Sequence, residues 1–357
     1  TLGNDTADDI TFNNGLSTGA ATSPSAKYIA GLIKATSGNI ALTGTTTHVT
    51  DTAIVGGTSA GSISFGNISI AAGEKLTIGA GSANAVSAGA ISGTAASADL
   101  TINVADTAAT AGSIGQIGAN IGTFEIQQSG GITVTGTTAA NTVTLTDTGN
   151  GKLIDFQANA TIGTLNTTGQ GYDVRLGGGG SITGGAATTF SNTGTLTISS
   201  GYSFPLGVTH TAGATSLAGT LSTTNAPVSL DDLGLGGTAA INTVNAGTGG
   251  GVSIGGDVTN AVSQSLSITA GTAGDVHVAG TIGSATALGA ITVNSAHDAT
   301  FDSTIAAASV AQSAGAGTTT FRDDISVSAA GTAFDVTSSA ITLDGLTVSS
   351  TYGSNAA

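Results

Sequence analysis

Three short phrases of the sequence share one pattern: DVHVAGTI at residues 275–282, DATFDSTI at 298–305 and TTTFRDDI at 318–325. In each phrase, outward-facing and inward-facing residues alternate over the first four positions, and the fourth residue is apolar. An Ile follows four residues after that apolar residue. A period of two is typical of a β-strand with one buried face. The phrases begin 23 and 20 residues apart, and a repeat of this length predicts stacked coils of short strands.

The same rhythm extends across the C-terminal third of the chain as three series of apolar residues. The first series is Ile254, Val278, Phe301, Phe321 and Leu343, with separations of 24, 23, 20 and 22 residues. The second is Ile282, Ile305 and Ile325, and the third is Ile268, Val293, Val310 and Val336. We predict that each series is a column of inward side chains in an all-β parallel β-solenoid (β-helix) with about 20–25 residues per coil and about 14 coils.

The composition agrees with this architecture. The 357 residues include 57 Gly but only 3 Pro, and just 4% are aromatic. Small residues fit the corners of narrow coils, and most backbone N–H groups are needed for strand pairing. We expect residues 1–45 to lead into the solenoid and residues 46–357 to form it continuously. Within the first part, residues 26–34 fit either a short helix or a strand. The alternative fold is a string of two or three antiparallel β-sandwich domains, but no linker is visible between them.

Charge and cysteine content narrow the class of protein. The formal net charge is −15, with only six Lys and Arg, which argues against nucleic acid and anionic membranes as partners. No run of about 18 apolar residues is present, so we expect no transmembrane segment. The absence of Cys removes disulfides and thiol chemistry and is compatible with secretion by a bacterium.

Residues 275–325 resemble the repeats of large bacterial surface proteins of the filamentous-haemagglutinin and autotransporter-passenger type, in which phrases such as D-V-T-F-x-G-x-I recur. The overall composition is also similar to that of bacterial surface-layer proteins. The resemblance implies a secreted, extracellular β-solenoid at a bacterial cell surface that serves as a stalk, an adhesin or a matrix fibre. It implies no catalytic residues.

Acidic side chains are the candidates for a metal site. Asp298, Asp302, Asp323 and Asp324 fall on adjacent coils if the repeat holds, and stacked carboxylates favour Ca²⁺ between them. Alternatively, Arg322 neutralises part of this charge. The four His residues are interpreted as solvated surface side chains. Because paired catalytic groups in a cleft are not evident, we predict that the protein is not an enzyme and has no other cofactor.

Both ends of the chain keep a strand pattern, and an open parallel edge invites further pairing. We predict assembly edges at Ile10 and Phe12 and at Ile341, Leu343, Leu346 and Val348. The sequence thus indicates a structural protein that pairs with copies of itself, head to tail or laterally, as a fibre, matrix filament or surface coat. One alternative is a monomeric adhesin stalk or passenger segment. Another is a carbohydrate-acting or ice-binding β-helix, and cell-surface polysaccharide is a further candidate partner.

Overall fold

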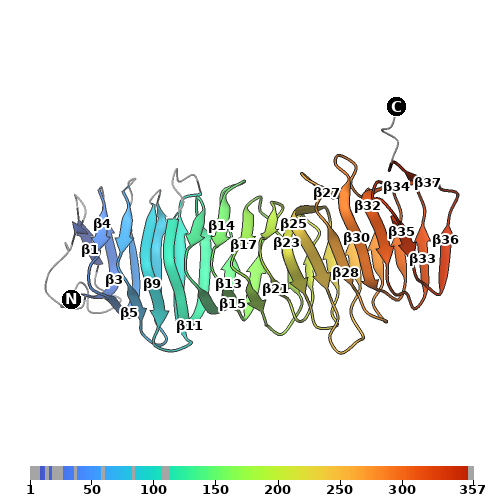
Figure 1. Cartoon of the computed structure of the whole chain (residues 1–357). Helices are drawn as coiled ribbons and strands as arrows, with labels where there is room; N and C mark the ends of the chain where they lie inside the picture. The colour runs from blue at the N-terminus through green and yellow to red at the C-terminus, as the bar shows by residue number, and fades with distance from the viewer. Residues whose placement is uncertain are drawn as a thin grey trace. The chain divides into compact units, whose positions relative to one another are not determined.

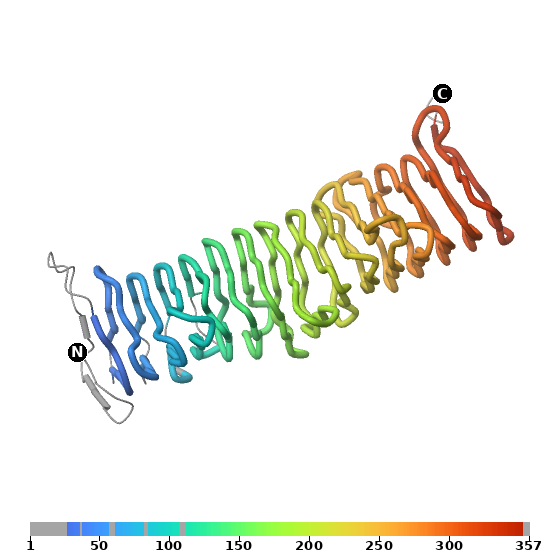
Figure 2. The backbone as a smooth tube through the Cα atoms, turned by 90° about the horizontal axis from the view of Figure 1, so that it is seen from below, coloured from blue at the N-terminus to red at the C-terminus, as the bar shows by residue number. Residues whose placement is uncertain are grey.

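The computed structural model describes residues 9–12, 16–17, 27–35, 38–57, 61–82, 85–106 and 112–352. Within these residues the chain is all-β, contains no helix, and stacks parallel strands in about 14 turns (Figure 1). The predicted β-solenoid is therefore confirmed. The alternative of antiparallel β-sandwich domains is wrong, because neighbouring strands pair in parallel, one coil apart (Figure 2).

The chain divides into two compact units. Unit 1 comprises residues 1–178 and 192–194, and unit 2 comprises residues 179–191 and 195–357. The strands of unit 1 are β1 (Asp9–Phe12), β2 (Leu16–Ser17), β3 (Lys27–Ala35), β4 (Ile40–Leu42), β5 (Thr47–Gly57), β6 (Ile63–Phe65), β7 (Ile68–Ile70), β8 (Lys75–Ser82), β9 (Val86–Gly93), β10 (Ala98–Val104), β11 (Gly112–Gln128), β12 (Ile132–Val134), β13 (Thr138–Leu145), β14 (Leu153–Phe156), β15 (Ala160–Ile162), β16 (Thr164–Thr167) and β17 (Asp173–Leu176).

The strands of unit 2 are β18 (Gly180–Ile182), β19 (Thr188–Thr189), β20 (Leu196–Ile198), β21 (Tyr202–Ser203), β22 (Val208–His210), β23 (Thr215–Ser222), β24 (Val228–Leu230), β25 (Leu233–Asn242), β26 (Val252–Ile254), β27 (Val258–Asn260), β28 (Leu266–Thr269), β29 (Val276–Val278), β30 (Leu288–Ser295), β31 (Ala299–Phe301), β32 (Ile305–Gln312), β33 (Thr318–Phe321), β34 (Ile325–Val327), β35 (Phe334–Val336), β36 (Ala340–Leu343) and β37 (Val348–Ser350). Residues 1–45, predicted to lead into the solenoid, include β3, which pairs in parallel with β5.

Many strands are only three residues long, and the alternation within them sets the direction of their side chains. In β12, Ile132 and Val134 are fully buried while Thr133 between them is partly exposed. β26 repeats this arrangement with Val252 and Ile254 around a Ser. Each coil therefore contributes a few apolar side chains to the core and a few hydroxyl groups to the surface. Burial of these side chains, at about 25 cal/mol per Å² of apolar surface, stabilises the stack.

In unit 2 the pairings of the first predicted column are confirmed residue by residue, and all of its members except Leu343 are buried. Ile254 pairs with Val278, Val278 with Phe301, Phe301 with Phe321, and Phe321 with Leu343. The second column is confirmed as well, because Ile282 bridges to Ile305 and Ile305 pairs with Ile325. The rings of Phe301 and Phe321 stack with centroids 5.1 Å apart, so the column also aligns aromatic faces.

The third predicted column is wrong at one position. Ile268 pairs with Val293, but the next residue in that column is Gln312, and Val310 pairs with Ile291 instead. Gln312 is buried, and its side-chain oxygen accepts a hydrogen bond of 2.7 Å from the hydroxyl of Thr319. A polar side chain at an inward position is invisible to a count of apolar residues. For this reason the apolar pattern assigned the position to Val310, two residues earlier.

Residues 26–34 fitted either a helix or a strand, and those of them that the structure describes belong to strand β3. Gly31 has φ 67°, and the pairing of β3 with β5 shifts register between Ile29 and Gly31. Glycine adopts this left-handed backbone conformation with little strain. On either side of the register shift, Ile29, Ala30 and Ile33 are buried in the core. The irregular spacing of these buried residues produced the helix-like pattern.

Asp and Asn side chains cap the amides where one coil follows another. The side-chain oxygen accepts the backbone N–H of a residue one coil later in the pairs Asn39–Ser62, Asp99–Thr123, Asp232–Asp257, Asp257–Thr281, Asp298–Thr318 and Asp324–Thr347. Glycine leaves room for two of these caps. A Cβ at Gly256 would lie 2.1 Å from Oδ1 of Asp232, and one at Gly317 would lie 2.1 Å from Oδ1 of Asp298. Several surface carboxylates of unit 2 therefore accept a backbone N–H from the next coil and stabilise the stack locally.

Candidate functional site

Asp302, one of the four predicted metal ligands, lies between two basic side chains. Its Oδ2 lies 2.7 Å from Nε2 of His277, and its Oδ1 accepts a 2.6 Å hydrogen bond from Arg322. The His277 hydrogen bond is the main influence that lowers the pKa of Asp302, and Arg322 adds to it. Here the structure favours the alternative in which Arg322 neutralises part of the acidic charge. As predicted, His277 faces outward between the buried Val276 and Val278.

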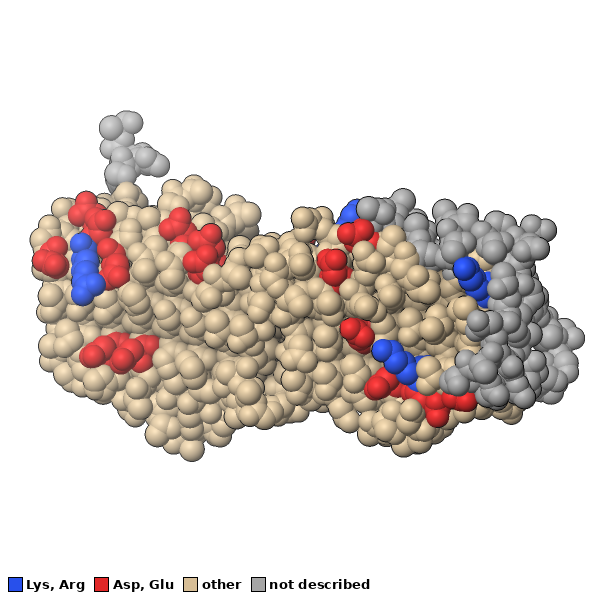
Figure 3. All heavy atoms as spheres, turned by 180° about the vertical axis from the view of Figure 1, so that it is seen from behind, with Lys and Arg blue, Asp and Glu red and all other residues tan. Residues whose placement is uncertain are grey.

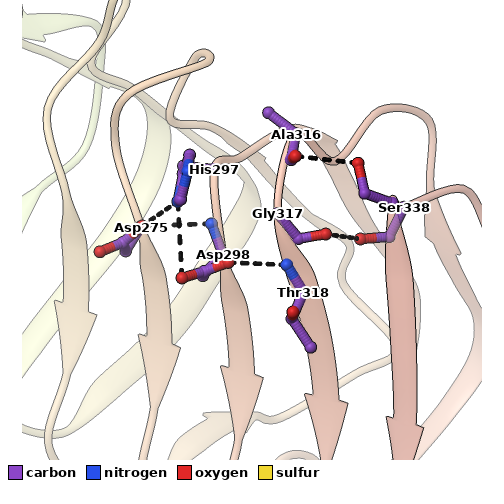
Figure 4. Close-up of polar contacts among 8 residues, drawn as sticks. Asp275, His297, Asp298, Ala316, Gly317, Thr318 and Ser338 are labelled. Atoms are coloured by element: carbon purple, nitrogen blue, oxygen red, sulfur yellow. Dashed lines mark hydrogen bonds and ion pairs between the residues drawn. The ribbon is translucent and has the colours of Figure 1, made fainter.

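Asp298 belongs to a different group of side chains (Figure 4). The imidazole Nδ1 of His297 lies 3.4 Å from Oδ1 of Asp275 and 3.4 Å from Oδ2 of Asp298. One ligand atom from each of the three residues lies within 4.8 Å of the other two. Among the residues that the structure describes, this is the one group of three His, Asp or Glu side chains that meets this criterion. The sequence pointed to Asp298 but not to Asp275, which precedes it by one coil.

Asp323 and Asp324 are held by backbone amides. Oδ1 of Asp323 accepts the N–H of Asp324, and Oδ1 of Asp324 accepts the N–H of Thr347. Asp324 also lines a shallow groove of about 320 Å³ together with Thr304, Ser326 and Ser349. The polar side chains lining the groove are hydroxyls and this single carboxylate. A lone carboxylate provides neither the pair needed for glycoside hydrolysis nor a set of metal ligands.

Unit 1 contains a charged pair that the sequence analysis missed. The carboxylate of Asp155 is buried and accepts hydrogen bonds from Nε and a terminal nitrogen of Arg175, which lies opposite it one coil later. Gln157 donates a third hydrogen bond of 2.9 Å to the same carboxylate. The hydrogen bond to Asp155 raises the pKa of the Arg175 guanidinium. The separation of 20 residues between the Asp and the Arg is the sequence signal that points to this pair.

The prediction that all four His side chains are solvated is wrong for His210. His210 is fully buried at the end of β22, with Nδ1 2.9 Å from the hydroxyl of Thr215 and its ring against Phe190. His48 is partly exposed and stacks on the exposed ring of Tyr28. The apolar partners of His210 come from neighbouring coils, so the local sequence around it gave no sign of burial.

Two of the four Tyr residues belong to the core. Tyr172 and Tyr202 are buried, and burial raises the pKa of both phenols above the ordinary value. The hydroxyl of Tyr172 donates a 2.8 Å hydrogen bond to the carbonyl of Leu145, one coil earlier. These two rings therefore stabilise the stack and offer no exposed platform to a sugar.

The predicted C-terminal edge is exposed in the structure. Strand β36 is the last strand of the eight-stranded sheet in unit 2 and pairs with β33, while β37 pairs with β34. Ile341, Leu343 and Val348 are 47%, 51% and 41% exposed, and Leu346 is partly exposed. At the other predicted edge, β1 carries Ile10 and Phe12 and pairs in parallel with β3. The side chains of β1 lie outside the described residues.

Charged side chains are sparse on the face of the molecule shown in Figure 3, where they gather in a few small groups. The described residues contain no helix that could cross a membrane. Comparison with protein-family models, curated proteins and solved structures finds no match to this chain. Any statement about function therefore depends on the chemistry of the surface groups and of the exposed edge.

Proposed function

We propose that the protein is a non-catalytic structural protein that self-assembles by continuing its coil-to-coil strand pairing onto a second copy. The observation that carries this proposal is the exposed edge of unit 2. Leu343 and Val348 continue the columns of Phe321 and Ile325, and those two residues are buried. A further parallel coil against β36 and β37 would bury the exposed residues in the same way.

The second copy supplies a suitable coil at its own N-terminal side. Strands β1 and β2 already pair in parallel with β3 and β4, so they have the strand direction that β36 and β37 require. Contact between two different edges of the same chain is a heterologous interface, and such an interface generates open filaments when the rotation does not close. A fibre, matrix filament or surface coat is the expected product. An extracellular location at a bacterial cell surface agrees with the absence of Cys.

Sedimentation velocity over a range of protein concentrations tests this proposal. We expect the wild-type chain to form species larger than the 33.6 kDa monomer as concentration rises. Leu343→Lys combined with Val348→Lys places two charges in the interface and should leave only monomer, because unpaired charges are costly to bury. The matched control is Leu206→Lys with Val262→Lys, two exposed apolar residues of unit 2 outside β36 and β37.

The outcome that contradicts the proposal is a wild-type chain that remains monomeric at every concentration. That result would favour the alternative of a monomeric adhesin stalk. Assembly of the edge variant to the same extent as the wild type would also contradict it, because association would then use another surface. Circular dichroism of the three proteins checks that the substitutions preserve the strands.

A further inference from the structure

The group formed by Asp275, His297 and Asp298 combines two carboxylates with an imidazole nitrogen. These donors come from two consecutive coils, since Asp275 directly precedes strand β29 and Asp298 directly precedes β31, which pairs with β29. All three side chains are about half-exposed, so an ion and its water ligands can reach them from solvent. We propose that this group binds a divalent first-row transition metal ion such as Zn²⁺.

The spacing of the donor atoms fits a metal better than a direct ion pair. Nδ1 of His297 lies 3.4 Å from an oxygen of each carboxylate, beyond the 2.7–3.2 Å range of good N–H···O hydrogen bonds. In a tetrahedral zinc site with bonds of about 2.1 Å, neighbouring ligand atoms lie about 3.4 Å apart. His277 and Asp302 in the same unit provide the contrast, because their atoms approach to 2.7 Å in a direct contact.

Both carboxylates are held in place by the backbone. Oδ1 of Asp275 accepts the N–H of Asp298 at 3.1 Å, and Oδ1 of Asp298 accepts the N–H of Thr318 at 2.6 Å. The second bond leaves Oδ2 of Asp298 directed toward His297. Donors fixed in this way lose little conformational freedom when an ion binds. The convergence of the three side chains favours binding.

The charge and the donor types select the ion. In the part of the chain that the structure describes, the ion pairs of Asp275 and Asp298 are with His297 and involve no Lys or Arg. The two carboxylates carry the charge that a divalent cation neutralises. Imidazole suits Zn²⁺, Ni²⁺ and Co²⁺, whereas Ca²⁺ prefers six to eight oxygen ligands. Three protein donors leave one tetrahedral position for water.

Calorimetric titration of the untagged chain with ZnCl₂ in a weakly coordinating buffer tests the site. We expect one Zn²⁺ per chain and an affinity at least about tenfold weaker in His297→Ala. Asp275→Asn should also weaken binding, because it removes a charge while retaining the oxygen that accepts the Asp298 amide. His277→Ala is the matched control, since it removes a surface His of the same unit outside the group, and it should bind Zn²⁺ like the wild type.

Absence of saturable Zn²⁺ binding to the wild type would overturn the proposal. Equal affinity of wild type and His297→Ala would overturn it as well, because the imidazole would then not be a ligand. A moderate excess of Ca²⁺ should leave Zn²⁺ bound, and ready displacement by Ca²⁺ would contradict a mixed nitrogen and oxygen site. The absorption of bound Co²⁺ adds a second readout, as it reports directly on a tetrahedral environment that includes nitrogen.

Discussion

Two Asp–Arg pairs, one in each unit, arise from the same register and differ in burial. Asp155 meets Arg175 and Asp302 meets Arg322, each across a separation of 20 residues. The side chain of Asp155 is only 2% exposed, whereas that of Asp302 is 28% exposed. The spacing in sequence thus determines which side chains meet on neighbouring coils. The side chains around the pair determine how much water reaches it and therefore how much the pair contributes to stability.

The largest expected effect is the loss of Arg175. Among the described residues, Arg175→Ala leaves the buried carboxylate of Asp155 with Gln157 as its remaining side-chain donor, so we expect a loss of about 3 kcal/mol in the free energy of unfolding. Urea denaturation followed by circular dichroism measures this loss. Asp155→Asn combined with Arg175→Gln removes both charges and should restore much of the stability. A loss below about 1 kcal/mol for Arg175→Ala would mean that Asp155 is as well hydrated as Asp302.

A third carboxylate, Asp298, extends the comparison because a backbone amide holds it. Gly317→Ala places a Cβ 2.1 Å from Oδ1 of Asp298 and displaces the oxygen that accepts the Thr318 amide. We expect a loss of about 1–2 kcal/mol, measured by thermal unfolding. The control is Gly185→Ala, where an added Cβ has no neighbour within 4 Å. If the cap is the cause, Gly317→Ala should cost much less in an Asp298→Ala background.

Arg322→Ala is the direct counterpart of Arg175→Ala. Because Arg322 is half-exposed and Asp302 keeps its contact with His277, we expect a loss of only about 0.5 kcal/mol. High salt should reduce this loss further, since ions screen exposed charges. Urea denaturation at low and high NaCl concentration provides the measurement. A loss equal to that of Arg175→Ala would remove the distinction between the two pairs.

The smallest expected effect concerns pH. The contact with His277 lowers the pKa of Asp302 below its ordinary value of 3.8, so the folded state binds this proton less readily than the unfolded state. The contribution of Asp302 to stability is therefore present above about pH 4 and is lost as the pH falls through the folded-state pKa. It should amount to a fraction of a kcal/mol. Carboxyl NMR of Asp302 should titrate below pH 3.8 in the wild type and closer to the ordinary value in His277→Ala.

The sequence predicted the fold class and two of the three inward columns of unit 2, because Ile, Val and Phe recur there at a nearly constant separation. It was wrong at Gln312, which is polar and inward, and at His210, whose apolar surroundings come from other coils. It also missed the Asp155–Arg175 pair. Coil lengths in unit 1 vary, for example 24 residues from Leu76 to Leu100 but 19 from Phe124 to Val143. Cross-coil partners follow only from the register, which depends on bulges and corners.

The acidic site shows the same limit of sequence reasoning. Asp302 and Asp323 are 21 residues apart, which suggested stacked carboxylates, yet the register places Arg322 beside Asp302. A difference of one residue changes which face of the coil a side chain occupies. Asp275 and Asp298 both begin a repeat phrase, 23 residues apart, so this alignment is the signal that could have identified Asp275 as a member of the group. The residue types were informative, but for Asp302 the side chains that meet could be read only from the strand pairing.

Cysteine cross-linking between two edge variants tests the central claim most directly, because the native chain contains no Cys. One variant carries Leu343→Cys in strand β36, and the other carries Ile10→Cys in strand β1. Mixed and oxidised, the two should form a disulfide-linked heterodimer, while Val262→Cys mixed with Ile10→Cys should not. A chain carrying both substitutions should yield a ladder of oligomers. Failure of the Leu343→Cys and Ile10→Cys variants to cross-link above the level of the Val262→Cys control would contradict assembly through these edges.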